Sequence, residues 1–493
     1  MIKKYSFILI LILIIGIGGF LRLYRIGDYM TFLGDEGRDM LVVKRMIVDH
    51  HFTLLGPITS VGLMHLGPVY YYFMAPFLWL SRLDPVGPAI MVALFSLATI
   101  LLIWKLAREF FDSRVAIISS LLYAISPLVI IQSHSSWNPN ILPFWSLLII
   151  YGLLKATIKG DNRWLLIIGL SLGIVLQLHY VALVFVPIII LSLFQAPIKL
   201  PVKYWGLLVL GAIATFSPFI IFELRHKFIN TITVYQFITR TGNAKSFGVM
   251  TVISTFWDLI VRLFWRLIVI KNAEISIIFL FIILGAIFYY LFTWKKKSVK
   301  RQALLLLSIW LIGGLGILSF YTGNIYDYYL TFAFPLPFLL TGVVFSSLMK
   351  KKLFRLIIIG VLIIIAIFEI EVTPILKPPN RLAAQSQEIA QFILRQSGSE
   401  KYNFALIAGK NSDHAYRYFL EIGGNTPIEI QDPNNDPTRI SVMPQLFVVC
   451  EEKVCQPLGH SLWEIAGFGR AEIAGQWNVG LFKIFKLTHY KSS

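Results

Sequence analysis

Charged residues are scarce in this sequence: Asp, Glu, Lys and Arg make up 14% of its 493 residues, and only 26 of them are acids. Hydrophobic residues make up 57%, and the mean hydropathy is +0.73. Soluble globular proteins do not accommodate this composition, so it predicts a polytopic α-helical membrane protein. The net charge of +18 does not indicate nucleic acid, because the basic residues form short clusters between apolar runs, where they orient membrane helices.

Motifs of cofactor chemistry are also missing. The sequence has no Walker-type loop, no dinucleotide-binding glycine pattern and no histidine pair at metal-ligand spacing. We therefore expect no cofactor and no soluble nucleotide substrate, although a divalent metal on Asp35, Glu36 and His65 stays open. The only two cysteines are Cys450 and Cys455, and their spacing fits either a small disulfide loop or two free thiols.

Long apolar runs predict about eleven membrane spans. They lie near residues 6–22, 86–104, 115–131, 141–156, 164–179, 181–195, 205–222, 274–294, 302–320, 327–348 and 354–370. With a cytoplasmic N-terminus, eleven crossings place every basic cluster between the runs in the cytoplasm; these clusters are Lys105 to Arg114, Lys155 to Arg163, Lys199 to Lys203, Lys295 to Arg301 and Lys350 to Arg355. The apolar run 66–80 must then be re-entrant or interfacial, since a further crossing would reverse the later clusters.

The apolar stretch 164–194 is too long for one straight span. A helix of this length would reach roughly 46 Å, whereas the hydrocarbon core is roughly 30 Å thick. We therefore expect two short helices that meet near His179 and Tyr180. Irregular backbone at this depth is tolerated only against protein or a water-filled cavity, which makes His179 a candidate cavity residue. Residues 257–266 mix aromatic, basic and aliphatic side chains at helical spacing and predict an interfacial helix.

The chain divides into two predicted domains. Residues 1–372 form a transmembrane module whose first outer loop is 23–85, and residues 373–493 form a small α/β domain after a proline-containing linker. In the second domain the pattern predicts a helix at 382–396, a strand at 404–408, a helix at 413–421, a strand at 445–450 and a hairpin through 471–486. Eleven crossings place this domain outside the cytoplasm.

Two adjacent carboxylates in the first outer loop are the leading candidates for chemistry. Gly34-Asp35-Glu36-Gly37 follows the first span and therefore faces outward. The same loop also carries His65-Leu66-Gly67-Pro68-Val69-Tyr70-Tyr71-Tyr72. A structural alternative is that the two acids cap a helix starting near Arg38, because carboxylates favour a helix N-terminus.

The predicted topology brings five polar sets to the outer side. They are Asp35 with Glu36; His65 with Tyr70 to Tyr72; Ser133 to Asn140; His179 with Tyr180; and Tyr321 to Tyr329. Each later set has a structural alternative: aromatics form interfacial belts, Asn138-Pro139-Asn140 fits a turn, and an isolated histidine is often a hydrogen-bonded core residue. Their coincidence on one side favours a common site.

These residue types suit transfer of a group from a lipid-linked phosphate. A carboxylate at the mouth of a lipid-accessible cavity can take a proton from an attacking hydroxyl or amine. Histidine, arginine, asparagine and tyrosine donors can hold the phosphate as it leaves with negative charge. Ion transport fits less well, because no charged residue lies at the centre of a predicted span.

The order of these motifs resembles a known family. Gly34-Asp35-Glu36-Gly37, then His65 to Tyr72, then Trp137-Asn138-Pro139-Asn140-Ile141-Leu142-Pro143 is similar to GT-C glycosyltransferases of family 39, which include protein O-mannosyltransferases and lipid A aminoarabinose transferases. The resemblance covers roughly residues 1–350. It implies a polyprenyl-phosphate sugar donor and action outside the cytoplasm. It also implies Asp35 as the catalytic base, with Glu36 in support and His65 in the donor-side loop.

The resemblance and the residue patterns together predict a glycosyltransferase of the inner (plasma) membrane. It transfers one hexose or pentose, with inversion, to a glycan, lipid or protein acceptor on the extracytoplasmic side. Asp35 and Glu36 are the expected catalytic residues, and the donor-binding candidates are Arg38, His65, His134, Asn138, Asn140, His179 and Tyr326. Arg38 has the alternative of anchoring lipid headgroups. The rival functions are an oligosaccharide transferase or polymerase of lipid-linked glycans, and a flippase or transporter of lipid-linked sugars.

Overall fold

The computed structural model describes residues 2–59, 64–196, 201–240, 248–452 and 454–490, and the chain forms two compact units. Unit 1 consists of Met1–Tyr24, Phe52–Met74 and Ala89–Pro378. Unit 2 consists of Arg25–His51, Ala75–Pro88 and Pro379–Ser493. This division differs from the predicted boundary at residue 373. Two parts of the first outer loop, which the sequence assigned to the membrane module, group with the C-terminal residues, through contacts such as Phe32 with Phe419 and the hydrogen bond from Tyr418 to the carbonyl of Leu83.

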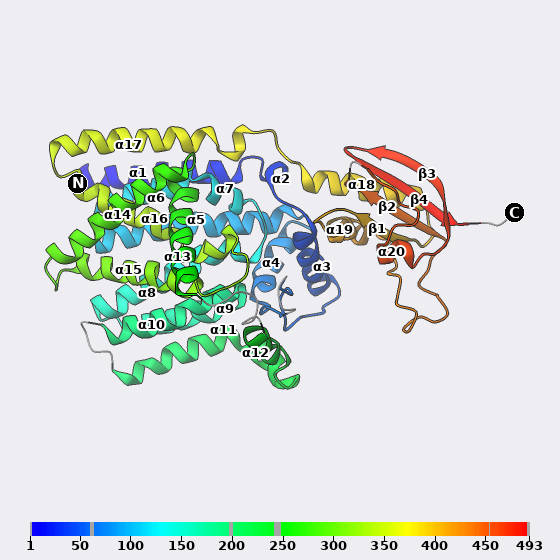
Figure 1. Cartoon of the computed structure of the whole chain (residues 1–493), viewed down its shortest axis with the longest axis horizontal. Helices are drawn as coiled ribbons and strands as arrows, with labels where there is room; N and C mark the ends of the chain where they lie inside the picture. Colours follow the sequence, from blue (N-terminus) through cyan, green and yellow to red (C-terminus); the bar gives the residue numbers. More distant parts are fainter. Residues whose placement is uncertain (1, 60–63, 197–200, 241–247, 453, 491–493) are drawn as a thin grey trace. The chain divides into compact units, whose positions relative to one another are not determined.

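Unit 1 is built from long apolar helices (Figure 1). In the described chain, seven helices are long and apolar enough to span a membrane: α1 (Ile2–Leu23), α5 (Val86–Phe110), α8 (Leu142–Lys159) with η1 (Asn138–Ile141), α11 (Trp205–Arg225), α14 (Ala273–Thr293), α15 (Val299–Leu318) and α17 (Lys352–Glu371). Two bent pairs raise the count to nine: α6 (Ser113–Ile125) with α7 (Pro127–Ser133), and η6 (Asp327–Ala333) with α16 (Pro335–Leu348).

These nine spans match nine of the eleven predicted runs and confirm the polytopic helical class. The other two runs form the shorter helices α9 (Trp164–Leu178) and α10 (Phe185–Phe194), so the number eleven is reached only if both cross. The run 66–80 forms α4 (Val69–Leu80), a 12-residue helix that is too short to count as a span.

The bend between α6 and α7 comes from Pro127 and is closed by a buried arginine. Proline has no backbone N–H, so it cannot bond the carbonyl of Tyr123 four residues earlier, and α6 ends there. Arg22, which is fully buried, donates to the carbonyls of Tyr123 at 3.2 Å and Ala124 at 2.7 Å and to Ser96 Oγ at 2.8 Å. One guanidinium therefore joins α1, α5 and the interrupted end of α6.

The break predicted near His179 is present. His179 has extended backbone (φ −164°, ψ 137°) and separates α9 from the short helix η2 (Tyr180–Val184), which leads into α10. The carbonyl of Leu178, at the end of α9, accepts a hydrogen bond from Asn138 Nδ2. The carbonyl left without a helical partner thus accepts a hydrogen bond from a side chain of another segment, as irregular backbone away from water requires.

Ion pairs join the helix ends that carry the predicted basic clusters. Lys155 Nζ lies 3.0 Å from Glu109 Oε1, and Lys300 Nζ lies 2.9 Å from Asp112 Oδ2. The first cluster therefore meets the second and the fourth at one end of unit 1. Lys199, in the third cluster, lies outside the described residues.

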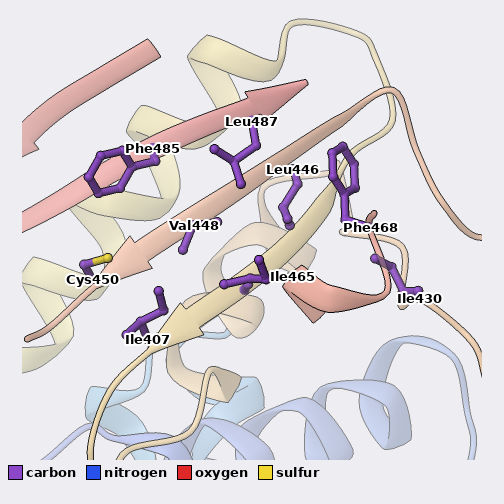
Figure 2. Packing of buried hydrophobic residues seen from close by; sticks show 10 residues of the cluster. Ile407, Ile430, Leu446, Val448, Cys450, Ile465, Phe468, Phe485 and Leu487 are labelled. Atoms are coloured by element: carbon purple, nitrogen blue, oxygen red, sulfur yellow. The ribbon is translucent and has the colours of Figure 1, made fainter. Parts of the chain in front are cut away.

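Unit 2 contains a four-stranded sheet of order β1-β2-β4-β3. β1 (Asn403–Ile407) and β2 (Gln445–Cys450) are parallel, and β3 (Ala471–Val479) and β4 (Phe482–His489) form an antiparallel hairpin. One face of the sheet packs on α20 (Trp463–Ala466) and its neighbours through the apolar cluster of Figure 2. Unit 2 also contains the helices α18 (Leu382–Ser397) and α19 (His414–Ile422). The ring of Tyr416 on α19 packs against that of Phe404 on β1. Each predicted helix and strand of this domain is present. Cys450 and Cys455 form a disulfide.

Replacing Asp112 by Ala should destabilise the basic end of unit 1. Asp112 caps α6 by accepting from Arg114 N and Val115 N, and it also holds Lys300 and Ser346. We expect the free energy of unfolding to fall by about 1–2 kcal/mol, as for other lost caps, seen as a lower melting temperature in detergent. The control is Asp161→Ala, in the loop between α8 and α9.

The destabilisation caused by Asp112→Ala should depend on pH. Burial alone would raise the pKa of Asp112, but Lys300 and the bonds from Val115 and Ser346 lower it overall. A carboxyl with a depressed folded-state pKa stabilises the fold above its unfolded pKa and loses this effect as the pH falls through the folded pKa. The difference between wild type and Asp112→Ala should therefore shrink in acid, and a constant difference would contradict this assignment.

Candidate functional site

The paired carboxylates take different roles at the start of α3 (Gly34–Val48). The chain before the helix is extended at Leu33, whose N–H donates to Glu36 Oε2 at 3.1 Å. Glu36 is only 5% exposed and completes a capping interaction. The side chain of Asp35 is 52% exposed. The capping alternative is therefore confirmed for Glu36, whereas Asp35 is the accessible carboxylate.

Arg38 lies one turn further along and fixes Asp35. Its Nη1 lies 2.8 Å from Asp35 Oδ1, and its Nη2 lies 2.9 Å from Oδ1 of the fully buried Asp39. A guanidinium held by two acids is ordered rather than free to rotate. The arrangement orients the Asp35 carboxylate.

Both glycines of the motif are required by close packing within unit 2. A Cβ built on Gly34 would lie 2.9 Å from Ser412 N, and one built on Gly37 would lie 2.5 Å from Ala415 Cα and from the carbonyl carbon of His414. Real Cβ atoms do not approach backbone atoms so closely. The first turn of α3 therefore packs directly on residues at the start of α19, and only glycine fits at these two positions.

Asn411 joins α3 to the sheet. Its Oδ1 accepts hydrogen bonds from Gly34 N and Ser412 N, each at 3.0 Å. Its Nδ2 donates to Glu451 Oε1 at 2.8 Å, just after β2. The backbone N–H that precedes Asp35 is thus positioned by a side chain 377 residues away in sequence. No local motif signals such a contact, and the sequence prediction did not include Asn411.

Further along α3, charge and aromatic pairs extend the contact with α19. Arg45 Nη2 lies 3.0 Å from Glu421 Oε2, and Lys44 Nζ lies 3.2 Å from the other oxygen of the same carboxylate. The hydrogen bond that Arg45 donates to Glu421 raises the pKa of Arg45. The buried ring of Phe32 lies 5.4 Å from that of Phe419. The helix that carries Asp35 is therefore anchored to the C-terminal domain along its length.

Substituting Gly37 by Ala should weaken this anchoring. The added methyl group would meet backbone atoms of His414 and Ala415, which cannot rotate away. We expect an increase in proteolysis of the C-terminal residues and a cost of roughly 1–3 kcal/mol, as for other overpacked sites. Limited trypsin digestion is the measurement. Gly360→Ala is the matched control, because nothing lies within 4 Å of a Cβ there, and equal digestion of the two variants would refute the packing argument.

In unit 1, the backbone of His65 is held by residues from two other segments. His65 pairs with Ile58 in an isolated bridge. Its N–H donates to Asn230 Oδ1 at 2.7 Å, and its carbonyl accepts from Tyr180 Oη at 2.5 Å and from Asn230 Nδ2 at 3.1 Å. The His65 loop is thus brought next to Tyr180, as the common-site prediction requires.

The other polar residues predicted from residues 134–140 are buried. His134 is 2% exposed, and Asn138 and Asn140 are 5% and 8% exposed. Asn138 donates to the carbonyl of Leu178, and Asn140 donates to that of Ser135 at 3.0 Å. Both amides therefore hydrogen-bond to backbone carbonyls of irregular segments and position that backbone. Their contact with the donor stays a prediction.

His179 meets the predicted tyrosines. Its ring lies 5.0 Å from that of Tyr329 and 5.8 Å from that of Tyr328, while its Nδ1 accepts from Val181 N at 3.1 Å. Tyr326 stacks on Tyr328 at 5.7 Å and is 54% exposed. The chain break and the loop before α16 thus form one aromatic cluster in which Tyr326 is accessible.

A polar cavity of about 340 Å³ lies next to this cluster, between α13 (Val249–Phe264) and the loop 319–325. Arg262 donates from Nη1 to the carbonyl of Ile325 at 2.7 Å and lies 3.3 Å from Asp258. Burial raises the pKa of Tyr321 to about 12, and its ring lies 6.0 Å from that of Tyr329. The remaining lining includes Thr251, Ser254, Thr255 and Asn324.

The sequence identified the loop that lines this cavity but not Arg262 as a site residue. The signal was available, since Asp258 and Arg262 are spaced as an i, i+4 ion pair on a helix. Within the described residues, no three His, Cys, Asp or Glu side chains gather as a metal site would require.

Comparisons with known proteins agree with the family resemblance. Residues 65–222 match the family model of dolichyl-phosphate-mannose-protein mannosyltransferases. A search of curated proteins gave no match. The crystal structure of ArnT from Cupriavidus metallidurans bound to undecaprenyl phosphate is similar at 14% identity and a TM-score of 0.64, over 96% of this chain and 97% of that one.

Two further structures share the fold. ArnT from the same organism in the apo state matches at 14% identity with a TM-score of 0.63, over 98% of each chain. The apo oligosaccharyltransferase of Archaeoglobus fulgidus matches at 14% identity with a TM-score of 0.56, over 95% of this chain and 72% of that one. The chain therefore shares the fold of ArnT, including a small C-terminal sheet region, and this agrees with the fold that the motif resemblance implies.

Proposed function

We propose that this protein is a membrane glycosyltransferase that transfers one sugar from a polyprenyl-phosphate-linked donor to an envelope glycan, lipid or protein. The observation that carries the proposal is the agreement in fold with ArnT over almost the whole of both chains. The solved ArnT is bound to undecaprenyl phosphate, a lipid phosphate of the proposed class. The family model matched by residues 65–222 names another lipid-phosphate sugar, dolichyl-phosphate mannose.

Asp35 is the proposed general base. In the transfer, a hydroxyl oxygen of the acceptor attacks the anomeric carbon while Asp35 takes the hydroxyl proton. The bond between the anomeric carbon and the phosphate oxygen breaks, and the polyprenyl phosphate leaves with the electron pair. Attack from the face opposite the phosphate inverts the anomeric centre. Two features support Asp35 in this role: its carboxylate is accessible, and Arg38 orders it.

Unit 1 supplies the proposed donor site. Hydroxyl groups, an amide and Arg262 line a cavity next to the His179 and Tyr326 cluster. Such donors suit sugar hydroxyls and a leaving phosphate. His65 is held beside Tyr180 and completes this set, whereas Asn138 and Asn140 are proposed to position the surrounding backbone.

The proposed site and the C-terminal domain face the extracytoplasmic side of the inner (plasma) membrane. Two features support this orientation. Basic clusters meet at one end of unit 1 through the Lys155 and Lys300 ion pairs, as expected of a cytoplasmic end. The disulfide between Cys450 and Cys455 suits an oxidising compartment.

Changing Asp35 to Asn should abolish sugar transfer by purified protein. Removing a general base typically costs 10²- to 10⁴-fold in rate, so we expect a fall of at least about 10²-fold. Binding of undecaprenyl phosphate, measured by its effect on the melting temperature, should stay unchanged. Asp28→Asn is the matched control, since Asp28 is also paired with an arginine, Arg25, in the same part of unit 2. Normal transfer by Asp35→Asn would exclude Asp35 as the base.

Changing Arg262 to Ala should weaken donor binding. The guanidinium orders the cavity loop through the Ile325 carbonyl, and its loss removes a charge-assisted donor. We expect the KM for a synthetic polyprenyl-phosphate sugar to rise about tenfold. Arg301→Ala is the control, because Arg301 also donates to a carbonyl, that of Leu291, but does not line the cavity. An unchanged KM would place the donor elsewhere.

A further inference from the structure

The C-terminal domain places two polar side chains beside the proposed base. Residues 411–415 contact the first turn of α3 through backbone atoms and the Asn411 amide, as the two motif glycines allow. Ser412 is the residue closest to Gly34, and Ala415 and the carbonyl carbon of His414 are closest to Gly37. Ser412 and His414 lie on the same segment, and in the described chain neither side chain makes a hydrogen bond to α3. The packing against α3 therefore leaves the hydroxyl of Ser412 and the imidazole of His414 available for other hydrogen bonds.

Ser412 and His414 are paired with each other. Ser412 Oγ lies 2.9 Å from His414 Nδ1, and the His414 side chain is 39% exposed. With the Ser412 hydroxyl donating to Nδ1, the ring proton is on Nε2, which has no partner among the described residues. An imidazole fixed through one nitrogen and open at the other is arranged to donate a hydrogen bond to a bound molecule.

Burial favours the neutral form of His414. Burial lowers the pKa of His414, and of the charged groups near it Asp413 and Asp35 raise the pKa while Arg417 and Arg38 lower it. Arg417 is itself bonded to Asp413, which limits the effect of that acid. The close approach of Gly34 to Ser412 and of Gly37 to His414 brings this segment against the turn of α3 that carries Asp35.

We propose that Ser412 and His414 form an acceptor-positioning site, in which His414 Nε2–H binds an oxygen of a hydroxyl-bearing acceptor and directs its nucleophilic hydroxyl toward Asp35. This inference rests on the proposed function of Asp35. It assigns to the C-terminal domain, for which the sequence offered no role, the positioning of the acceptor. His414 is a positioning residue, because the proton goes to Asp35 and the leaving phosphate does not involve the imidazole.

The test uses the full chain in lipid nanodiscs and follows release of undecaprenyl phosphate from a panel of undecaprenyl-phosphate-linked single sugars, mannose included. The rate is measured with and without an envelope extract as the acceptor pool. For His414→Ala we expect the half-saturating amount of extract to rise about tenfold, as for loss of one hydrogen bond. The KM for the donor and the slow release to water should stay within twofold of wild type. His414→Gln, which keeps an N–H donor, should recover part of the loss.

Ser412→Ala should give an intermediate rise, since it leaves the imidazole present but unfixed. His460→Ala is the matched control, because His460 is a histidine of the same domain that contacts Leu462 N rather than the α3 region. The inference is overturned if His414→Ala responds to the extract as wild type does, or if both KM values rise together and glutamine restores nothing. Failure of the proposed function has a different signature: Asp35→Asn would retain extract-dependent release.

Discussion

The packing of α3 on the start of α19 is the contact on which the position of Asp35 depends. It has no space for a side chain at Gly34 or Gly37, and it uses the Asn411 amide to hold the first N–H of the helix. Backbone-to-backbone approach of this kind is rigid, since no rotamer change can relax it. The accessible carboxylate is therefore part of a body that includes the C-terminal sheet, and a small soluble domain at the end of the chain becomes structurally necessary to a motif near its beginning.

In unit 1, many polar side chains serve the backbone. Breaks in membrane helices free N–H and C=O groups that lipid cannot satisfy. Asn138 and Arg22 donate to such carbonyls, and Tyr180 and Asn230 donate in the same way to the loop carbonyl of His65. The breaks in turn create the polar surroundings that a phosphate or sugar requires. A polar side chain at these positions can therefore have a structural and a functional role at once, because the groups that stabilise the irregular backbone also surround the space in which a ligand would lie.

The sequence predicted the features that arise from local patterns. Apolar runs predicted the nine spans and the short helices around His179, and alternating or helical periodicity predicted α18, α19 and the four strands of the C-terminal domain, but not the short helix α20. Capping of the helix by Glu36 was likewise foreseen from its position. Contacts between distant segments were not predictable, because Asn411 lies 377 residues from Gly34 and no periodicity links them. Arg262 differs in this respect, because its i, i+4 pairing with Asp258 could have been read from the sequence.

The buried guanidinium of Arg22 has a consequence for biogenesis. Apart from the carbonyl of Gly18, its acceptors lie 74 to 102 residues later, on helices that the ribosome has not yet made when α1 reaches the translocon. A lone arginine near the end of an apolar helix stays at the lipid headgroups, where water can solvate it. The first helix therefore enters the bilayer at one depth and reaches its final depth only after the broken end of α6 has been made. Assembly of the helix bundle must then wait for the synthesis of Tyr123 and Ala124.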